Sequence, residues 1–337
     1  MNFSFPGEKK TGMNLLRVPE NKYDLFNTQY PDIMEFGMKQ LRAVWLPNEI
    51  SYDEDRTHFQ ELKDDRIKHI LKRIIGFFFT SDGIVFANLD ENFKEEFKSP
   101  DVKFTLGAFE VIERIHAISY GFQLDSIIID EEEKKSLMNA IVEVESIKKM
   151  AEFAFKYMKQ ETPLYLRIVA FLCIEGIFFS SPFAFIFWIR KYLPKKFPGI
   201  VSANDFISKD ENLHSEYSAY VINLFRNEGI FEQKEATAIF REATAVALDF
   251  VDDTFPDDLL GMTRGMMRTH VKYIANRWAQ MIGLPVLHDD ARKTPFTFMD
   301  NIALGKKDNF FEVKDLTEYQ GAPNVNVSFT NPENESF

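Results

Sequence analysis

Cysteine is nearly absent from this chain of 337 residues, in which Cys173 is the single example. One cysteine excludes a disulfide bond within the chain and is typical of a reducing compartment, so we expect a cytoplasmic protein. Acidic residues outnumber basic ones by 52 to 40, and no basic stripe is present. A nucleic-acid-binding surface would need such a stripe, so we expect no nucleic-acid partner.

Several other signals are missing as well. The sequence contains no glycine-rich phosphate loop, no nucleophile elbow, no internal repeat and no strand-like alternation of useful length. The first twenty residues are mixed polar sequence without the apolar run of a signal peptide. With 45% hydrophobic and 27% charged residues, the composition is that of an ordinary soluble globular protein.

One apolar segment is long enough to cross a bilayer. The 22 residues between Arg167 and Arg190 are mostly Val, Ile, Phe, Leu and Ala. Glu175 lies near the middle of this segment, Ser180-Ser181-Pro182 follows it, and no second run of this length occurs. Because a lone charge at bilayer depth is costly, we expect a helix buried in a bundle and no membrane association.

The rest of the chain has a helical pattern. Apolar periodicity and helix start signals predict helices over about 31–43, 64–89, 101–129, 135–159, 163–193, 203–227, 234–251 and 259–282. The predicted fold class is therefore all-α. We expect an irregular arm over 1–25, one helical domain over 26–312 and a flexible tail over 313–337, where Asn, Pro, Glu and Ser cannot bury a core.

Two Glu-x-x-His motifs are the most informative feature of the sequence. Glu113 and His116 stand at i and i+3, and Tyr120 follows four residues later, so in a helix all three project from one face. Glu211 and His214 repeat the spacing later in the chain. One such motif is usually a surface pair, but two on facing helices are how four-helix bundles hold a pair of carboxylate-bridged metal ions.

Two further acids complete a ligand set. A dinuclear site of this kind takes about six protein ligands, so two more helices must each supply a carboxylate. Asp82 lies in Phe-Phe-Phe-Thr-Ser-Asp-Gly, and Glu175 lies in Phe-Leu-Cys-Ile-Glu-Gly-Ile-Phe-Phe. An unpaired carboxylate in such apolar surroundings would be expensive. The predicted metal ligands are Asp82, Glu113, His116, Glu175, Glu211 and His214.

Five motifs in order then indicate a family. They are Ser81-Asp82-Gly-Ile-Val, Glu113-Arg-Ile-His116-Ala-Ile-Ser-Tyr120, Val-Ala-Phe-Leu-Cys-Ile-Glu175-Gly-Ile-Phe-Phe, Ser208-Lys-Asp210-Glu211-Asn-Leu-His214 and Asn309-Phe-Phe-Glu312. From about Trp45 to Tyr319 the chain resembles the small, radical-generating subunit of class I ribonucleotide reductase in its eukaryotic and viral form. The resemblance implies a ferritin-like bundle, a homodimer and a ribonucleoside-diphosphate reductase that is active only with a large subunit. For a viral member, the expected location is the host cytoplasm.

The resemblance also implies the cofactor. The six ligands would hold an oxo-bridged di-iron centre that reacts with oxygen, with the help of an electron donor, and oxidises Tyr120 to a stored tyrosyl radical. The family's apolar radical pocket matches Phe179, Phe183 and Ile207, for which plain core packing is a compatible interpretation. Manganese is an alternative metal, because carboxylate and imidazole ligands suit it as well.

Radical transfer is implied in the same way. Trp45 and Asp210 match the family's relay, in which the metal-bound histidine, here His116, hydrogen-bonds an aspartate that holds a tryptophan. From the residues alone, Trp45 is equally consistent with a hydrophobic contact at a helix end, and Asp210 is equally consistent with an acidic residue on the surface. Tyr319 matches the tail tyrosine that passes the electron hole to the large subunit.

The last residues, 326–337, are expected to insert into the large subunit, anchored by Phe329 and Phe337. Two other classes stay open at this point. An iron store would use a similar site without the relay or the docking tail. A monooxygenase or desaturase would need an open cavity where Phe179 and Phe183 crowd.

Overall fold

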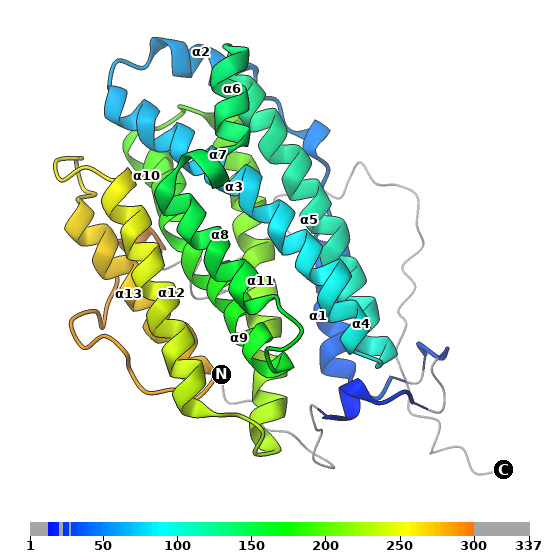
Figure 1. Cartoon of the computed structure of the whole chain (residues 1–337). Helices are drawn as coiled ribbons and strands as arrows, with labels where there is room; N and C mark the ends of the chain where they lie inside the picture. The colour runs from blue at the N-terminus through cyan, green and yellow to red at the C-terminus, as the bar shows by residue number, and fades with distance from the viewer. Residues whose placement is uncertain (1–12, 20–22, 27, 300–337) are drawn as a thin grey trace. The chain divides into compact units, whose positions relative to one another are not determined.

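The structure is a computed structural model that describes residues 13–19, 23–26 and 28–299 (Figure 1). Within these ranges all regular secondary structure is helical, so the predicted all-α class is confirmed. The helices belong to one compact unit within residues 1–303. The predicted boundary between domain and tail, at 312 and 313, lies outside the described residues.

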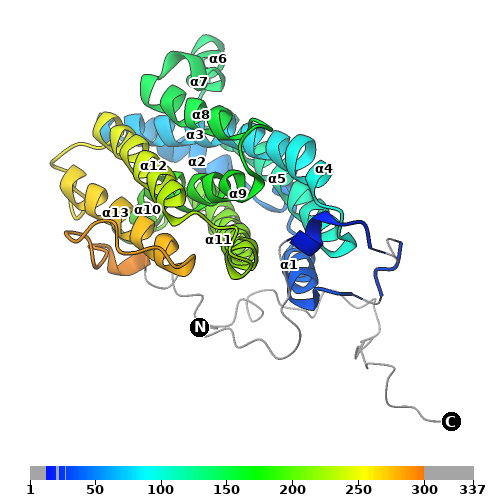
Figure 2. The same cartoon turned by 60° about the horizontal axis from the view of Figure 1, so that its bottom comes forward.

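Four helical columns form the centre of the unit. Three of them are single helices: α3 (Asp65–Asn88), α5 (Pro100–Ile127) and α11 (Pro198–Asn227). The fourth consists of three consecutive elements, α9 (Leu164–Cys173), the π-helical turn η4 (Ile174–Phe178) and α10 (Ser180–Tyr192). The helix α3 packs along α5, and α11 packs along α9 and η4 (Figures 1 and 2). Each predicted Glu-x-x-His motif and each embedded acid therefore stands on a different column.

Other helices surround these columns. The helix α1 (Pro31–Arg42) packs on α5, α8 (Glu145–Tyr157) and α12 (Gln233–Thr254) cover α9, and α13 (Arg264–Met281) packs on α12 and α10. The helix α2 (Asp53–Glu61) contacts both α5 and α11. The remaining segments are η1 (Met13–Leu16), η2 (Pro47–Glu49), the π-helical η3 (Leu89–Phe93), α4 (Lys94–Glu96), α6 (Glu131–Met138), α7 (Ala140–Glu143) and η5 (Thr297–Met299).

Here one predicted helix needs correction, and one helix was missed. The single helix expected over 135–159 is three helices, α6, α7 and α8, because the extended backbone of Val144 separates α7 from α8 and Asn139 ends α6. The helix α2 was not predicted, since it is short and charged and buries only Asp55 and Phe59. Its position matters, because Asp55 accepts hydrogen bonds from Gly199 N at 3.0 Å and Ile200 N at 3.1 Å and so caps α11.

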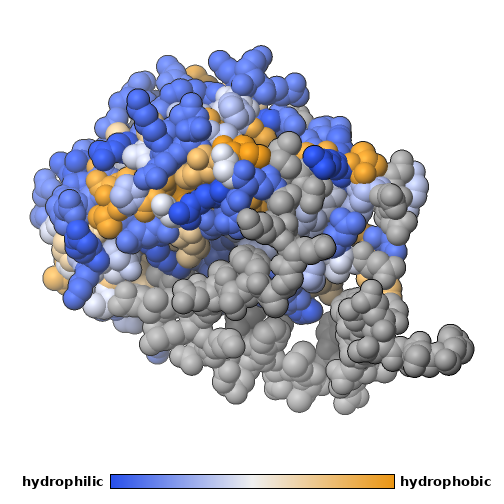
Figure 3. Space-filling model, turned by 90° about the horizontal axis from the view of Figure 1, so that it is seen from below, coloured by the Kyte–Doolittle hydropathy of each residue, from blue (hydrophilic) through white to orange (hydrophobic). Residues whose placement is uncertain are grey.

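The apolar column is a core element. Leu164–Tyr192 is the one helical stretch in the described ranges that is long and apolar enough to span a membrane, and its apolar window is completely buried. The prediction of a buried bundle helix accounts for this burial. Surface helices are instead two-sided: in α8, Ile147, Met150 and Phe153 are buried while Lys148 and Glu152 are exposed. Seen from below, hydrophilic side chains predominate on the described surface, with apolar ones gathered in a band among them (Figure 3).

Part of the predicted N-terminal arm is attached to the bundle. Leu15, within the short turn η1, is fully buried, and its carbonyl oxygen accepts hydrogen bonds from Lys98 N at 2.8 Å and Ser99 N at 3.0 Å. Those two residues directly precede α5. The arm therefore contacts the start of the helix that carries the first Glu-x-x-His motif.

Candidate metal centre

The structure brings the six predicted ligands together at the centre of the four columns. Asp82, Glu113, His116 and Glu211 form one group, and Glu113, Glu175, Glu211 and His214 form a second, with the ligand atoms of each group within 4.8 Å of one another. Every one of these side chains is buried, with at most 2% of its surface exposed. Because Glu113 and Glu211 belong to both groups, two metal ions held here would share these two carboxylates, and each ion would take two of the other four residues.

The polar atoms that face the centre of this cluster have no hydrogen-bond partners. Both oxygens of each of the four carboxylates and the Nδ1 atoms of His116 and His214 are buried without one. His116 Nδ1 lies 3.1 Å from Glu211 Oε1, and His214 Nδ1 lies 2.9 Å from Glu113 Oε1, yet neither contact has hydrogen-bond geometry. Buried polar atoms are normally hydrogen-bonded, so this concentration of unpaired oxygen and nitrogen atoms around one point fits a pair of cations.

The electrostatics of the cluster agree with that fit. Burial raises the pKa of Asp82 and of Glu175 well above the ordinary carboxyl value, and the neighbouring carboxylates raise it further. Burial alone would lower the pKa of His116 and His214, but their carboxylate neighbours outweigh it and the pKa of both imidazoles is raised. Without a positive charge at the centre, the four carboxylates cannot all be ionised cheaply.

A π-helical turn places Glu175. The residues Ile174–Phe178 form a wider turn than an α-helix, between α9 and α10. A side chain at Gly176 would collide with Trp278, whose Nε1 atom would lie 2.6 Å from its Cβ, so a glycine here lets α13 approach. The sequence predicts this column as one regular helix, because hydrophobicity alone does not reveal an inserted residue.

The outer nitrogens of both histidines are held by polar side chains. His116 Nε2 lies 3.1 Å from Asp210 Oδ2, which also accepts a hydrogen bond from Trp45 Nε1 at 3.1 Å. Gln40 donates to Asp210 Oδ1 at 2.8 Å, and its Oε1 lies 3.2 Å from His214 Nε2. These contacts keep the protons on Nε2 and turn both Nδ1 lone pairs toward the centre. The predicted contacts of Trp45, Asp210 and His116 are present, whereas Gln40 was missed because nothing distinguishes it within α1.

Tyr120 lies in an aromatic enclosure. The ring is fully buried and stacks on Phe78, with the centroids 4.7 Å apart and the planes 12° apart. Its hydroxyl donates to Asn204 Oδ1 at 3.5 Å, and burial raises the pKa of the phenol well above its usual value. Phe183 and Phe179 contact Phe78, at centroid distances of 5.0 and 5.5 Å.

Two of the predicted pocket residues, Phe179 and Phe183, therefore contact a ring that the sequence did not single out. Phe78 was hidden in a run of three phenylalanines, Phe77, Phe78 and Phe79, of which only contact across helices singles one out. Ile207 is fully buried on α11, three residues after Asn204. Tyr319, Phe329 and Phe337 lie outside the described residues.

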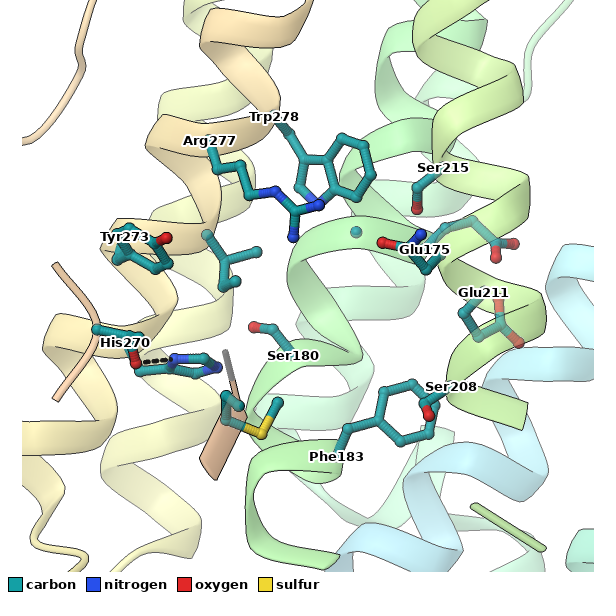
Figure 4. A pocket seen from close by; sticks show the side chains of 15 residues that line it. Glu175, Ser180, Phe183, Ser208, Glu211, Ser215, His270, Tyr273, Arg277 and Trp278 are labelled. Carbon is teal, nitrogen blue, oxygen red and sulfur yellow. Dashed lines mark hydrogen bonds between the residues drawn. The ribbon is translucent and has the colours of Figure 1, made fainter. Parts of the chain in front are cut away.

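A small cavity reaches the cluster from the side of α13. It has a volume of about 70 Å³ and is lined by Glu175, Glu211, Ser215, Arg277 and Trp278, among others. Figure 4 shows the Arg277 guanidinium directed into the space between α13 and η4, with Glu175 and Glu211 on the far side. Ser215 Oγ is buried without a hydrogen-bond partner. The cavity is large enough for one or two small molecules the size of water.

These features define a class: a helical bundle of the ferritin-like kind, with a buried cluster of carboxylates and histidines at its centre that suits a dinuclear metal site. Comparison with known proteins makes the assignment narrower. Residues 22–295 match the family described as "Ribonucleotide reductase, small chain". The chain belongs to this family, and its activity is that of the ribonucleoside-diphosphate reductase small chain, an oxidoreductase component.

Individual relatives agree. The ribonucleoside-diphosphate reductase small chains of Trypanosoma brucei brucei and Yaba-like disease virus are each 34% identical to this chain, over 91% of its length and 89% and 92% of theirs. The Rnr4 homodimer structure from Saccharomyces cerevisiae superposes with a TM-score of 0.75 at 26% identity, covering 91% of this chain and 93% of that one. The iron-storage and monooxygenase alternatives find no support among these relatives.

Proposed function

We propose that Asp82, Glu113, His116, Glu175, Glu211 and His214 hold a di-iron centre that generates a stored radical on Tyr120. The observation that carries the proposal is the set of buried, unpartnered ligand atoms beside a fully buried tyrosine. When bound, the two ions would supply activation of dioxygen and a one-electron oxidant for the phenol. Iron is favoured over manganese by the resemblance of the motifs, since the donor set itself suits both metals.

The protein's own residues have separate tasks in this proposal. Glu113 and Glu211, which belong to both groups, would be shared by the two ions, Asp82 and Glu175 would balance charge at the two ends, and the histidines would bind through Nδ1. Four carboxylates carry four negative charges, which two divalent ions neutralise. Phe78, with Phe179 and Phe183 behind it, excludes water and reductants from Tyr120, which a stored radical requires.

Transfer of the radical uses the outer hydrogen bonds. Asp210 joins His116 to Trp45 through one carboxylate oxygen, with both nitrogens at 3.1 Å. In the proposal, this contact carries the electron hole away from the metal centre, and Tyr319 passes it to the large subunit. Phe329 and Phe337 anchor the tail peptide there. The substrate and the thiols that reduce it belong to the large subunit, which agrees with a single, buried cysteine here.

The decisive experiment is electron paramagnetic resonance of protein reconstituted with ferrous ion and oxygen, with metal quantified on the same sample. We expect a tyrosyl signal and about two irons per chain, as a two-metal site requires. A radical that appears only after loading with manganese would change the metal assignment. Stoichiometric iron with no radical under any activation would overturn the radical assignment.

Substitution of the tyrosine separates the two halves of the proposal. Tyr120→Phe should bind metal like the wild type, because the hydroxyl is not among the ligand atoms, yet form no stored radical and support no reduction with the large subunit. Tyr217→Phe, which removes another buried hydroxyl, is the matched control. Retained reduction by Tyr120→Phe would reject Tyr120 as the radical site.

We further propose that a second copy of the chain packs on the outer face of α5. Val111, Ile118 and Phe122 stand at i, i+7 and i+11 on this helix and are 50%, 53% and 42% exposed. Such a row of exposed apolar side chains on one face is typical of an interface. Ile118→Glu should shift the protein from dimer to monomer in analytical ultracentrifugation, whereas the change Val142→Glu, at an exposed valine outside this face, should not.

A further inference from the structure

A chain of hydrogen bonds connects Tyr120 to the edge of the bundle. Tyr120 donates to Asn204 Oδ1 at 3.5 Å, and Asn204 Nδ2 donates to Gln123 Oε1 at 2.8 Å. Gln123 Nε2 then donates to Ser119 Oγ at 3.3 Å, and Ser119 Oγ lies 3.0 Å from the hydroxyl of Tyr52. Asn204, Gln123 and Ser119 are fully buried, whereas Tyr52 is half-buried.

The orientation of the Asn204 amide is fixed by this arrangement. Its second N–H donates to the carbonyl oxygen of Ile200 at 2.8 Å, one turn earlier on α11. A backbone carbonyl can only accept, so the nitrogen must face Ile200 and the oxygen must face Tyr120. Reversing the amide would place its oxygen against two acceptors, Ile200 O and Gln123 Oε1, which is costly in a buried site.

We propose that Asn204, locked by Ile200 and Gln123, is a positioning residue that offers Tyr120 a hydrogen-bond acceptor and withholds a donor. The inference rests on the proposed role of Tyr120 and deepens it. A phenol can donate to Asn204 Oδ1, but a phenoxyl oxygen can only accept. The contact therefore stabilises the reduced tyrosine and is lost in the radical, which makes the radical a stronger oxidant.

The oxidation that this contact opposes has a simple balance. Tyr120 loses one electron and its phenolic proton; dioxygen, which the bound metal ions would activate, is the oxidant, and its reduction to water takes up the proton. An amide oxygen is too weak a base to keep that proton, so Asn204 does not take it.

The hydrogen-bonding state of the radical is measurable directly. High-field electron paramagnetic resonance reports it through the largest g value, and deuterium exchange with electron-nuclear double resonance detects an exchangeable donor. Gln123→Leu removes one of the two contacts that lock the Asn204 amide, so reversal of the amide, which would present an N–H to the phenoxyl oxygen, becomes less costly. We expect this variant to show a lower g value and a new exchangeable coupling relative to the wild type.

Two other variants complete the test. Asn204→Leu keeps a similar volume and removes the acceptor, so it should add no coupling and shift the phenol–radical equilibrium toward the radical by roughly five- to tenfold, the effect of one buried hydrogen bond. Tyr52→Phe loosens only the outer end of the chain and should give a smaller change in the direction of Gln123→Leu. Tyr165→Phe, whose hydroxyl bonds Glu235 elsewhere, is the control.

The outcomes distinguish this inference from the proposed function. Identical spectra in wild type, Asn204→Leu and Gln123→Leu would overturn it, as would a wild-type exchangeable coupling that disappears in Asn204→Leu. In both cases the radical itself would still be observed. Failure of the wild type to form any tyrosyl radical with metal bound would instead reject the proposed function on which the inference rests.

Discussion

Trp45 and His116 share one carboxylate oxygen: the indole Nε1 and the imidazole Nε2 each lie 3.1 Å from Asp210 Oδ2. Asp210 is buried and also accepts from Gln40, so three donors converge on a single side chain. A carboxylate can accept all three, whereas an amide cannot. This convergence couples the ring orientation of a predicted metal ligand to the position of Trp45.

Asp210→Asn tests that coupling. The new amide must turn its N–H group toward one of the three donors, so the network that orients His116 directly and His214 through Gln40 loses at least one hydrogen bond. We expect metal affinity to fall by about 10- to 100-fold, the usual effect of losing a partner of a ligating histidine, and radical transfer to be lost. Metal titration and reduction assays with the large subunit measure the two effects. Asp205→Asn, on the same helix, is the control, and wild-type affinity in Asp210→Asn would contradict the prediction.

Gln40 should matter for the other histidine. Gln40→Leu has a similar volume but leaves His214 Nε2 and Asp210 Oδ1 without their present partners. We expect the metal affinity to fall on the order of tenfold or more. The two metal ions should then bind in unequal steps, because only the His214 end of the site is affected directly. Calorimetric titration with a divalent metal resolves such steps. Gln280→Leu, an exposed glutamine on α13, should bind as the wild type does.

The sequence predicted which six side chains converge at the centre of the bundle, because much of the pattern is local. Glu113 with His116 and Glu211 with His214 are three residues apart, and helical geometry alone puts each pair on one face. Asp82 and Glu175 were found because an acid inside a phenylalanine-rich run is costly to bury unless a cation or a hydrogen bond balances its charge.

The surroundings of the ligands could not be predicted in the same way. Gln40, Phe78 and Asn204 act through contacts between residues far apart in the chain, and each has an ordinary local context. The π-helical turn at Glu175 was missed for a related reason, since an inserted residue does not alter the apolar composition. The helix α2 was missed because its stability comes from contacts with α5 and α11 and not from its own sequence.

Removal of metal should make stability depend on pH in a defined direction. The pKa values of Asp82, Glu175, His116 and His214 are all raised in the metal-free protein. A raised pKa contributes stability below the unfolded-state value, and that stability is lost as pH rises through the folded-state value. The metal-free protein should therefore unfold at a lower temperature at pH 8 than at pH 6.

The loaded protein should behave differently. Its ligands are already deprotonated and paired with cations, so this loss of stability between pH 6 and 8 should be absent. Metal at a thousandfold excess over its Kd should raise the free energy of unfolding by about 4 kcal/mol. Calorimetry with and without metal at both pH values checks this. A metal-free protein that gains stability between pH 6 and 8 would contradict the raised pKa values of the two acids and the two histidines.

Asp55 should give a second, separate pH effect. Burial, its largest cause, raises the pKa of this carboxyl from 3.8 to about 6, although two backbone N–H groups of α11 partly oppose the rise. Because the pKa of Asp55 is higher in the folded than in the unfolded protein, protonation of this carboxyl favours folding. Its stabilising contribution is therefore complete below about pH 4 and is lost as pH rises through about 6. Asp55→Asn keeps a capping oxygen and should remove this dependence in thermal unfolding measured from pH 4 to 7. Asp53→Asn, at an exposed aspartate of the same helix, should leave it unchanged.

The cavity beside Glu175 should control how fast small molecules reach the centre. Ser215 lines it with an unpartnered hydroxyl, so Ser215→Leu would occupy part of its volume of about 70 Å³ with apolar atoms and no direct contact to the ligand atoms would be lost. We expect the ferrous-loaded variant to bind metal normally but to react with dioxygen several-fold more slowly in stopped-flow absorption measurements. Ser215→Ala, which keeps the cavity open, should react at the wild-type rate. Equal rates for Ser215→Leu and wild type would mean that oxygen reaches the centre by another path, and slow rates for both variants would point to the hydroxyl itself.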